Sequence, residues 1–177
     1  MPDSSLTSRV AWFERTFRFD FSARLYPEIL ERFRGTPARV GELIAPLSNT
    51  VLTRRDDQPW SIQENIGHLA DLDELFLGRL DDFDAGLPQL RAADVTNRKT
   101  HEAGYNLRPS AEVVGGFRRL RAEAMRRLEE VALAQFERVA IHPRLKQPMR
   151  LVDMVYFQCE HDDYHVARIR ELMRLFS

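Results

Sequence analysis

The sequence predicts an all-α protein that folds as an up-down-down-up four-helix bundle, with a long connection between helices two and three and an N-terminal arm. Apolar residues recur at helical spacing in four long segments, which are separated by prolines and capping residues. The first and third connections are short, whereas the second has about 25 residues and can run back along a whole helix. We expect residues 1–177, 44% of them hydrophobic, to form one domain in which 1–24 are the arm.

Proline and capping residues mark the first two helices. Pro27 begins the first helix, which we expect to reach Leu47 after a kink and a new N-cap at residues 35–37. The second helix begins at residues 61–64, which read Ser-Ile-Gln-Glu and match a capping box. Its apolar spacing continues to Phe83.

The third and fourth helices are marked in the same way. Ser110 follows a proline and begins the third helix, which we expect to end near Ala134. The fourth helix is expected from Pro148 almost to Ser177. Between them, residues 136–141 have the composition of a short extended segment.

The segment before the first helix is too aromatic to be a disordered tail. We expect residues 8–21 to pack across the bundle as an arm or a short helix. The apolar residues that support this expectation are Val10, Trp12, Phe13, Phe17, Phe19 and Phe21.

Charge and composition exclude several classes of partner. The 26 Lys and Arg residues nearly balance the 27 Asp and Glu residues, so the long-range positive field of a nucleic-acid-binding protein is missing. The densest basic run lies in the third helix, where nearby glutamates favour a solvated helix face. Its residues are Arg118, Arg119, Arg121, Arg126 and Arg127.

No apolar stretch approaches the roughly 18 residues that a membrane span needs, and residues 1–9 lack a signal-like run. A single cysteine, Cys159, rules out an internal disulfide. We therefore expect a cytoplasmic protein with a small-molecule substrate and no membrane or nucleic-acid partner.

Two histidines, His161 and His165, indicate a metal site in the fourth helix. Residues four apart on a helix point the same way about one turn apart, which suits one metal ion. Counted at about 100° per residue from Met154, both histidines fall at the centre of the apolar stripe. The alternative is a pair of neutral core histidines, each hydrogen-bonded across the bundle. Burying two titratable rings in one layer costs free energy unless both bind the same partner, which favours a metal ion.

The third ligand has to lie upstream, because residues 166–177 contain no histidine or cysteine. His68 is the best candidate, seven residues into the second helix. If this helix lies antiparallel to the fourth, His68 is about 10 Å from one end of the bundle and the histidine pair about 15 Å, so the three rings can converge.

Three neutral imidazoles without a fourth protein ligand describe an open metal site that is suited to catalysis. Cys159 does not complete it, because it points away from the core stripe and is expected to be buried packing. Zincin, di-iron and His-Asp phosphohydrolase motifs do not match the order or spacing of the ligands.

These residues resemble those of the DinB-like superfamily, which includes bacillithiol- and mycothiol-dependent S-transferases. The resemblance is carried by Trp60-Ser61-Ile62-x-Glu64-x-x-x-His68-Leu69-Ala70 and His161-Asp162-x-Tyr164-His165-x-x-x-Ile169. It implies the same bundle topology, a divalent metal, usually zinc or nickel, on His68, His161 and His165, and frequent homodimers. It also implies a low-molecular-weight thiol as a cosubstrate in some members.

Residues around the metal supply candidates for catalysis. Gln158, one turn before His161, can bond a ligand of the metal, and Asp162 and Tyr164 flank the inner face as further candidates. Glu64 can act as a base, although capping explains it better. We expect the mouth of the site near Arg54, Arg55, Tyr105, Asn106 and Arg108.

The leading hypothesis is a metal-dependent enzyme, either a small-thiol S-transferase or a hydrolase that uses metal-bound water. The rival hypotheses are a bundle in which the metal is only structural and a binding module that acts through a dimer face. The absence of a fourth protein ligand favours a catalytic over a structural metal, whereas the lack of a clear general base weakens this preference.

Overall fold

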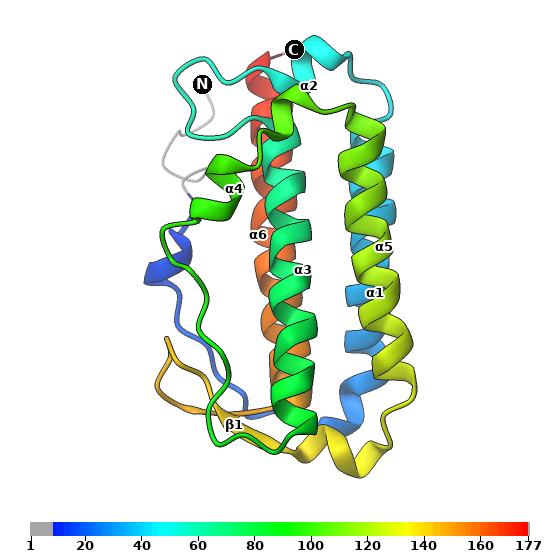
Figure 1. The fold of residues 1–177 in the computed structure, drawn as a ribbon, viewed down its shortest axis with the longest axis vertical. Helices are drawn as coiled ribbons and strands as arrows, with labels where there is room; N and C mark the ends of the chain where they lie inside the picture. The colour runs from blue at the N-terminus through cyan, green and yellow to red at the C-terminus, as the bar shows by residue number, and fades with distance from the viewer. Residues whose placement is uncertain (1–8, 177) are drawn as a thin grey trace, which may run out of the picture.

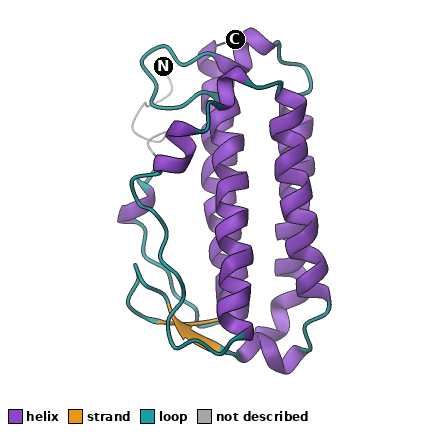
Figure 2. Ribbon diagram, viewed as in Figure 1, coloured by secondary structure: helices purple, strands orange, loops and turns teal. Residues whose placement is uncertain are grey.

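Four long helices form the bundle in the structure, a computed structural model that describes residues 9–176 (Figures 1 and 2). Two short helices, α2 (Asn49–Thr53) and α4 (Arg98–Glu102), lie in the connections. The long helices are α1 (Tyr26–Ile44), α3 (Ile62–Asp84), α5 (Ser110–Glu129) and α6 (Leu151–Phe176).

The helices follow the predicted up-down-down-up order. In Figure 1, α1 and α6 run in one direction, and α3 and α5 run in the other. The closest neighbours are the parallel pairs, α3 with α5 and α1 with α6. Because α3 also packs against the antiparallel α6, the two helices that carry the histidines face each other. The predicted fold is confirmed.

The helix ends differ from the prediction at three places. Helix α1 continues through Pro37 without a new N-cap and ends at Ile44. Helix α5 ends at Glu129, because a separate 3₁₀-helix follows at Leu133–Glu137. Pro148 lies in a strand, and the backbone N–H of Arg150 donates to the Asp153 carboxylate at 2.8 Å, so α6 begins only at Leu151.

A small hairpin takes the place of the predicted extended segment. Strand β1 (Val139–Ile141) pairs antiparallel with β2 (Pro148–Arg150). The long second connection is attached to this hairpin, since the N–H of Leu90 donates to the Ile141 carbonyl at 3.0 Å. The connection and the hairpin thus form one wall beside α3 and α6 (Figure 1).

The start of α3 is fixed by the predicted capping box. The hydroxyl of Ser61 accepts from the N–H of Glu64 at 3.1 Å, and the Glu64 carboxylate accepts from the N–H of Ser61 at 2.8 Å. Arg55 forms an ion pair with the same carboxylate. Glu64 therefore acts as a cap rather than as a base. This cap sets the depth of His68 along the helix.

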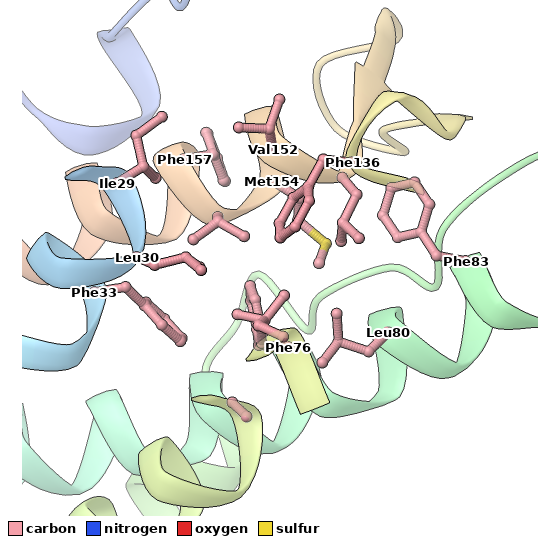
Figure 3. Close-up of a cluster of buried hydrophobic side chains, with 14 of the residues drawn as sticks. Ile29, Leu30, Phe33, Phe76, Leu80, Phe83, Phe136, Val152, Met154 and Phe157 are labelled. Atoms are coloured by element: carbon pink, nitrogen blue, oxygen red, sulfur yellow. The ribbon is translucent and has the colours of Figure 1, made fainter. Parts of the chain in front are cut away.

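The core consists of two clusters of buried apolar side chains. One fills the half of the bundle near the hairpin and includes Phe33, Phe76 and Phe136 (Figure 3). The other lies towards the opposite end and includes Phe117 and Ile66. Burial at these sites supplies most of the stabilisation of the bundle.

Arg121 lies between the two clusters, where its guanidinium packs on Phe33 and Phe117. The predicted solvated position of this arginine is wrong, because only 1% of the residue is exposed. It donates to the Asp73 carboxylate at 2.8 and 3.0 Å and to Asp162 at 2.8 Å, and these two charges make burial of the cation tolerable. The exposed arginines of α5 behave as predicted, as in the pair of Arg126 with glutamates of its own helix.

The N-terminal arm packs on α6 through aromatic rings. Residues Trp12–Glu14 form one 3₁₀ turn, and the ring of Trp12 lies 5.2 Å from both Phe17 and Phe157. The arm predicted from residue 8 is confirmed from residue 9 onwards, and Ser8 lies outside the described residues. Within residues 9–176, no helix is both long and apolar enough to cross a membrane.

Candidate metal centre

The structure brings His68 of α3 together with His161 and His165 of α6. One ring nitrogen from each lies within 4.8 Å of the other two, and all three residues are buried. The ring centroids are 4.5 to 5.3 Å apart. The antiparallel contact of α3 and α6 therefore places three imidazoles around one point, as their depths along the helices predict.

Asn65 orients the ring of His165. The amide nitrogen of Asn65 donates to the Ser61 carbonyl at 2.7 Å, which turns its oxygen towards His165. This oxygen lies 2.9 Å from Nδ1 of His165 and can only accept, so Nδ1 carries the proton. Nε2 of His165 is left with its lone pair for a metal ion.

A longer relay orients His68. The hydroxyl of Thr100 donates to Asp71 at 2.8 Å and lies 3.0 Å from Nδ1 of His68, from which it accepts. The other oxygen of Asp71 accepts from the Tyr105 hydroxyl at 2.8 Å. A carboxylate behind a metal-binding histidine fixes its tautomer and makes the ring a stronger ligand. Nε2 of His68 is thereby also free.

His161 is held by packing rather than by hydrogen bonds. Its ring meets Trp12 of the arm edge-on at 4.9 Å. Its Nδ1 is buried and has no hydrogen-bond partner in the part of the chain that the structure describes. Neither a protein polar group nor solvent thus satisfies this nitrogen, which is unusual for a buried histidine that has only a structural role.

The three rings are neutral in the metal-free protein. Burial lowers the pKa of His68 from 6.5 to about 3, with a smaller effect of the nearby His101. Burial also places the pKa values of His161 and His165 well below 6.5, reinforced by the neighbouring histidines. A neutral imidazole is the form that binds metal, so no proton has to be displaced at neutral pH.

This donor set fits a divalent metal ion. Imidazole nitrogen suits zinc, nickel, copper and iron. Among the described residues, no Cys, Asp or Glu joins the three histidines as a fourth ligand. Cys159 is buried with its thiol 3.7 Å from the Ile29 carbonyl, on the packing side predicted for it. The cluster therefore has the form of an open site.

The histidines form part of the wall of a cavity of about 920 Å³. Its other walls come from the arm, the long connection and the loop between the two strands, which lie on one side of α3 and α6 in Figure 1. Rings of Trp12, Trp60 and Phe157 line much of it. The partly open, largely apolar site is suited to a small organic molecule.

The candidate catalytic residues separate into two groups. Gln158 and Tyr164 line the cavity beside the histidines. Asp162 does not line it, because its carboxylate is fully buried in the core in the ion pair with Arg121. The two positions differ because a helix turns about 100° per residue, and the wheel placed Asp162 only at the border of the inner face.

The mouth predicted for the cavity is wrong. Arg54 and Arg108 pair with Asp56 and Glu112 at the surface. Arg55 and Asn106 contact the capping box, and Tyr105 contacts Asp71 behind His68. The cavity instead opens on the side of the bundle. No pattern in the sequence predicts this, because the arm and the connection cover α3 and α6 through contacts between distant segments. None of the five predicted residues lines the cavity: Arg54, Arg55, Tyr105, Asn106 and Arg108.

Comparison with known proteins agrees with this geometry. The sequence model of the DinB superfamily matches residues 32–169, which include all three histidines and all four long helices in whole or in part. The chain belongs to the DinB superfamily. The predicted resemblance is confirmed.

A solved DinB-like bundle also resembles this DinB-superfamily chain. It is YfiT from Bacillus subtilis, described as a probable metal-dependent hydrolase with an unusual four-helix bundle topology. The TM-score is 0.73 at 20% sequence identity, over 90% of this chain and 92% of YfiT. At this identity the likeness establishes the shared fold. A search among curated proteins found no match.

Several residues that support the histidines were not predicted as such. Asn65 and Asp71 are three residues before and after His68, so helical spacing alone places them on its face. Thr100 gave no signal, because it comes from the connection and reaches His68 only in the folded chain. Trp12 was predicted only as part of the aromatic arm, not as a contact of His161.

We expect the metal-free protein to lose stability as the pH falls below about 6.5. The buried histidines have pKa values below 6.5 in the folded state, so the unfolded chain binds more protons between pH 6.5 and about 3. Each contributes up to about 1.4 kcal/mol per pH unit in that window. Urea unfolding of metal-free protein at a series of pH values measures the effect. A free energy of unfolding that stays constant between about pH 7.5 and 5.5 would contradict it.

Replacement of Asn65 by alanine should weaken metal binding by about 10- to 100-fold, because His165 loses the acceptor that fixes its tautomer. Competition with a chromogenic chelator measures the affinity. Asn106→Ala is the matched control, since Asn106 also contacts the capping residue Ser61 but touches no histidine. Equal affinity of Asn65→Ala and the parent protein would show that this hydrogen bond does not orient the ligand.

Proposed function

We propose that this chain is a metal-dependent hydrolase of a small organic substrate, with zinc or nickel held by His68, His161 and His165. The single observation that carries the proposal is the position of the three histidines in the wall of a cavity, without a fourth protein ligand among the described residues. A purely structural metal would be saturated by protein ligands and would need no adjoining cavity. A divalent ion in this position lowers the pKa of a bound water or thiol towards neutrality.

The surrounding side chains support a nucleophile at this point. Gln158 is 5% exposed and lines the cavity one turn before His161. Its amide nitrogen donates to Asp162 at 3.4 Å, and its amide oxygen accepts no hydrogen bond within the described residues. In our proposal this oxygen accepts a hydrogen bond from the nucleophile and orients it. Trp12 packs against His161 and Tyr164 packs against His165, and these rings exclude water from the histidines.

The description of YfiT as a probable metal-dependent hydrolase supports the same reaction class. The second candidate is the transfer of a small thiol to an electrophile. The volume of the cavity, about 920 Å³, favours it, because this lies near the upper end for single ligands and leaves room for a cosubstrate. In both reactions the chain's own residues bind the electrophile and hold the nucleophile beside it.

A two-part assay tests the proposal. Metal-loaded protein is incubated with a panel of carboxylic and phosphoric esters and, separately, with small thiols and haloaromatic electrophiles. Hydrolysis that is lost with the metal and with His165→Ala supports the hydrolase; turnover that requires a thiol supports the transferase. If neither panel reacts, and removal of the metal unfolds the bundle, the metal is structural and the proposal is wrong.

Homodimerisation, which the family resemblance implies, stays a prediction. The arm presents Val10 and Phe13 with 59% and 62% of their surfaces exposed, which supports a contact there. Sedimentation equilibrium of the parent chain and of Phe13→Ser tests it. A parent chain that remains monomeric at all concentrations would contradict the prediction.

A further inference from the structure

The wall of the cavity beyond the histidines contains positive charge that no described acid neutralises. Arg79 and Arg121 are both buried arginines, with 5% and 1% of the residue exposed. Arg121 is paired with two aspartates, whereas Arg79 has no ion pair in the described chain. A buried cation without a counter-charge is costly, so a protein retains one where a ligand supplies the charge.

Arg79 reaches this wall from the same face of α3 as His68. It is 11 residues further along, which is about 20° from the same direction and about 16 Å of helix rise. Its Nε donates to the Arg91 carbonyl at 3.1 Å, its terminal nitrogens form no hydrogen bond or ion pair with residues 9–176, and the side chain lines the cavity. The nearest carboxylate, Asp82, is engaged by the side chain and the N–H of Arg91.

Burial lowers the pKa of Arg79 from 12.5 to about 10, against the opposing field of Asp82. The guanidinium is therefore still charged at neutral pH.

Arg144, in the loop between β1 and β2, adds a second charge. Its guanidinium lies 5.3 to 5.5 Å from the rings of Phe13, Trp12 and Phe157, which hold it in place. Its Nη2 is buried and has no hydrogen-bond partner in the described part of the chain. No ion pair is formed by Arg144 with any residue that the structure describes.

His142 supplies a neutral donor in the same loop. Its Nδ1 accepts from the N–H of Leu145 at 3.1 Å, so the proton of the neutral ring is on Nε2. This Nε2 is buried and has no partner among the described residues. Arg79, Arg144 and His142 thus present only donors, and all three line the cavity.

The acidic residues that line the cavity do not neutralise the charges of Arg79 and Arg144. Asp71 and Glu74 are engaged by Lys99 and by the relay behind His68. Asp94 accepts from residues 96 and 98 of its own loop. The cavity therefore has one wall, around Asp71 and Glu74, in which the charges are paired, and a basic wall, around Arg79 and the hairpin loop, in which they are not.

We propose that Arg79, Arg144 and His142 form a binding site for an anionic group, a carboxylate or a sulfonate or phosphate oxyanion, of the molecule that enters the cavity. This inference deepens the proposed function, since it names the substrate as an organic anion. The arginines provide forked donors that match such groups. The guanidinium of Arg144 and the ring of His161 both pack on Trp12, so the anionic group and the bond that reacts share one cavity.

Calorimetric titration with benzoate and benzenesulfonate, and with uncharged benzamide, tests the site without turnover. We expect metal-loaded protein to bind both anions at least about tenfold more tightly than benzamide. Arg144→Gln and Arg79→Met should each remove this preference and leave benzamide unchanged. Arg126→Gln is the matched control, because it removes the same charge from the exposed face of α5.

Fluorescence provides a second readout, since Trp12 and Trp60 are the chain's two tryptophans and both line the cavity. If Arg79→Met does not fold, Arg144→Gln in the loop decides the question alone. If the arginine variants keep the anion preference, or if only His161→Ala loses it, the anion binds at the metal and the inference is overturned. Anion binding without turnover of any ester or thiol would instead overturn only the proposed function.

Discussion

His161→Ala should lower the affinity for a divalent metal by more than about 100-fold, because it removes a ligand and loss of supporting residues alone costs about 10- to 100-fold. The cluster offers no replacement, since Cys, Asp and Glu of the described chain lie elsewhere. Protein purified without a nickel column and analysed for metal by mass spectrometry should contain about one ion per chain for the parent and almost none for the variant.

The matched control for this experiment is His142→Ala. His142 is likewise buried and contacts Phe157, but it is not one of the converging histidines. The His142→Ala variant should therefore retain the full metal content, although it loses about as much packing as His161→Ala. Circular dichroism should show both variants folded, because the two apolar clusters do not depend on the metal. A full metal content in His161→Ala would exclude this histidine as a ligand.

Arg121→Met should destabilise the bundle by about 3–5 kcal/mol, the range found when one partner of a buried ion pair is removed. The substitution leaves the carboxylates of Asp73 and Asp162 buried between the two apolar clusters without their counter-charge. A domain's whole stability is only about 5–15 kcal/mol, so the change should be large in urea unfolding.

Two further variants separate charge from packing. Arg126→Met, on the exposed face of the same helix, should change the stability by less than about 0.5 kcal/mol. Replacing Arg121, Asp73 and Asp162 together by apolar residues should recover most of the loss, since no charge is left unpaired. A cost below about 1 kcal/mol for Arg121→Met would show that water reaches the two aspartates.

Local signals in the sequence account for the bundle. The capping box at Ser61, the apolar periodicity and the lengths of the three connections predict the order and direction of the helices, and the structure agrees. The prediction failed where tertiary packing decides. Pro37 is accommodated inside α1, and Arg121 is buried only because two distant helices supply its aspartates.

The convergence of the three histidines was predictable for a related reason. His161 and His165 follow from helical spacing on α6, and His68 follows from its depth on an antiparallel helix. The cavity was not predictable, because its walls come from the arm, the connection and the hairpin loop. Helical periodicity carries no information about how such segments fold over α3 and α6, so the mouth and the basic wall emerge only from the structure.

X-ray absorption spectroscopy of protein loaded with one equivalent of zinc tests the central claim most directly. The open three-histidine site predicts three imidazole nitrogens at about 2.0–2.1 Å and at least one further oxygen from solvent. A sulfur at about 2.3 Å would mean that Cys159, the chain's one cysteine, is a ligand. That result, or a spectrum with fewer than three imidazoles, would contradict the site described above.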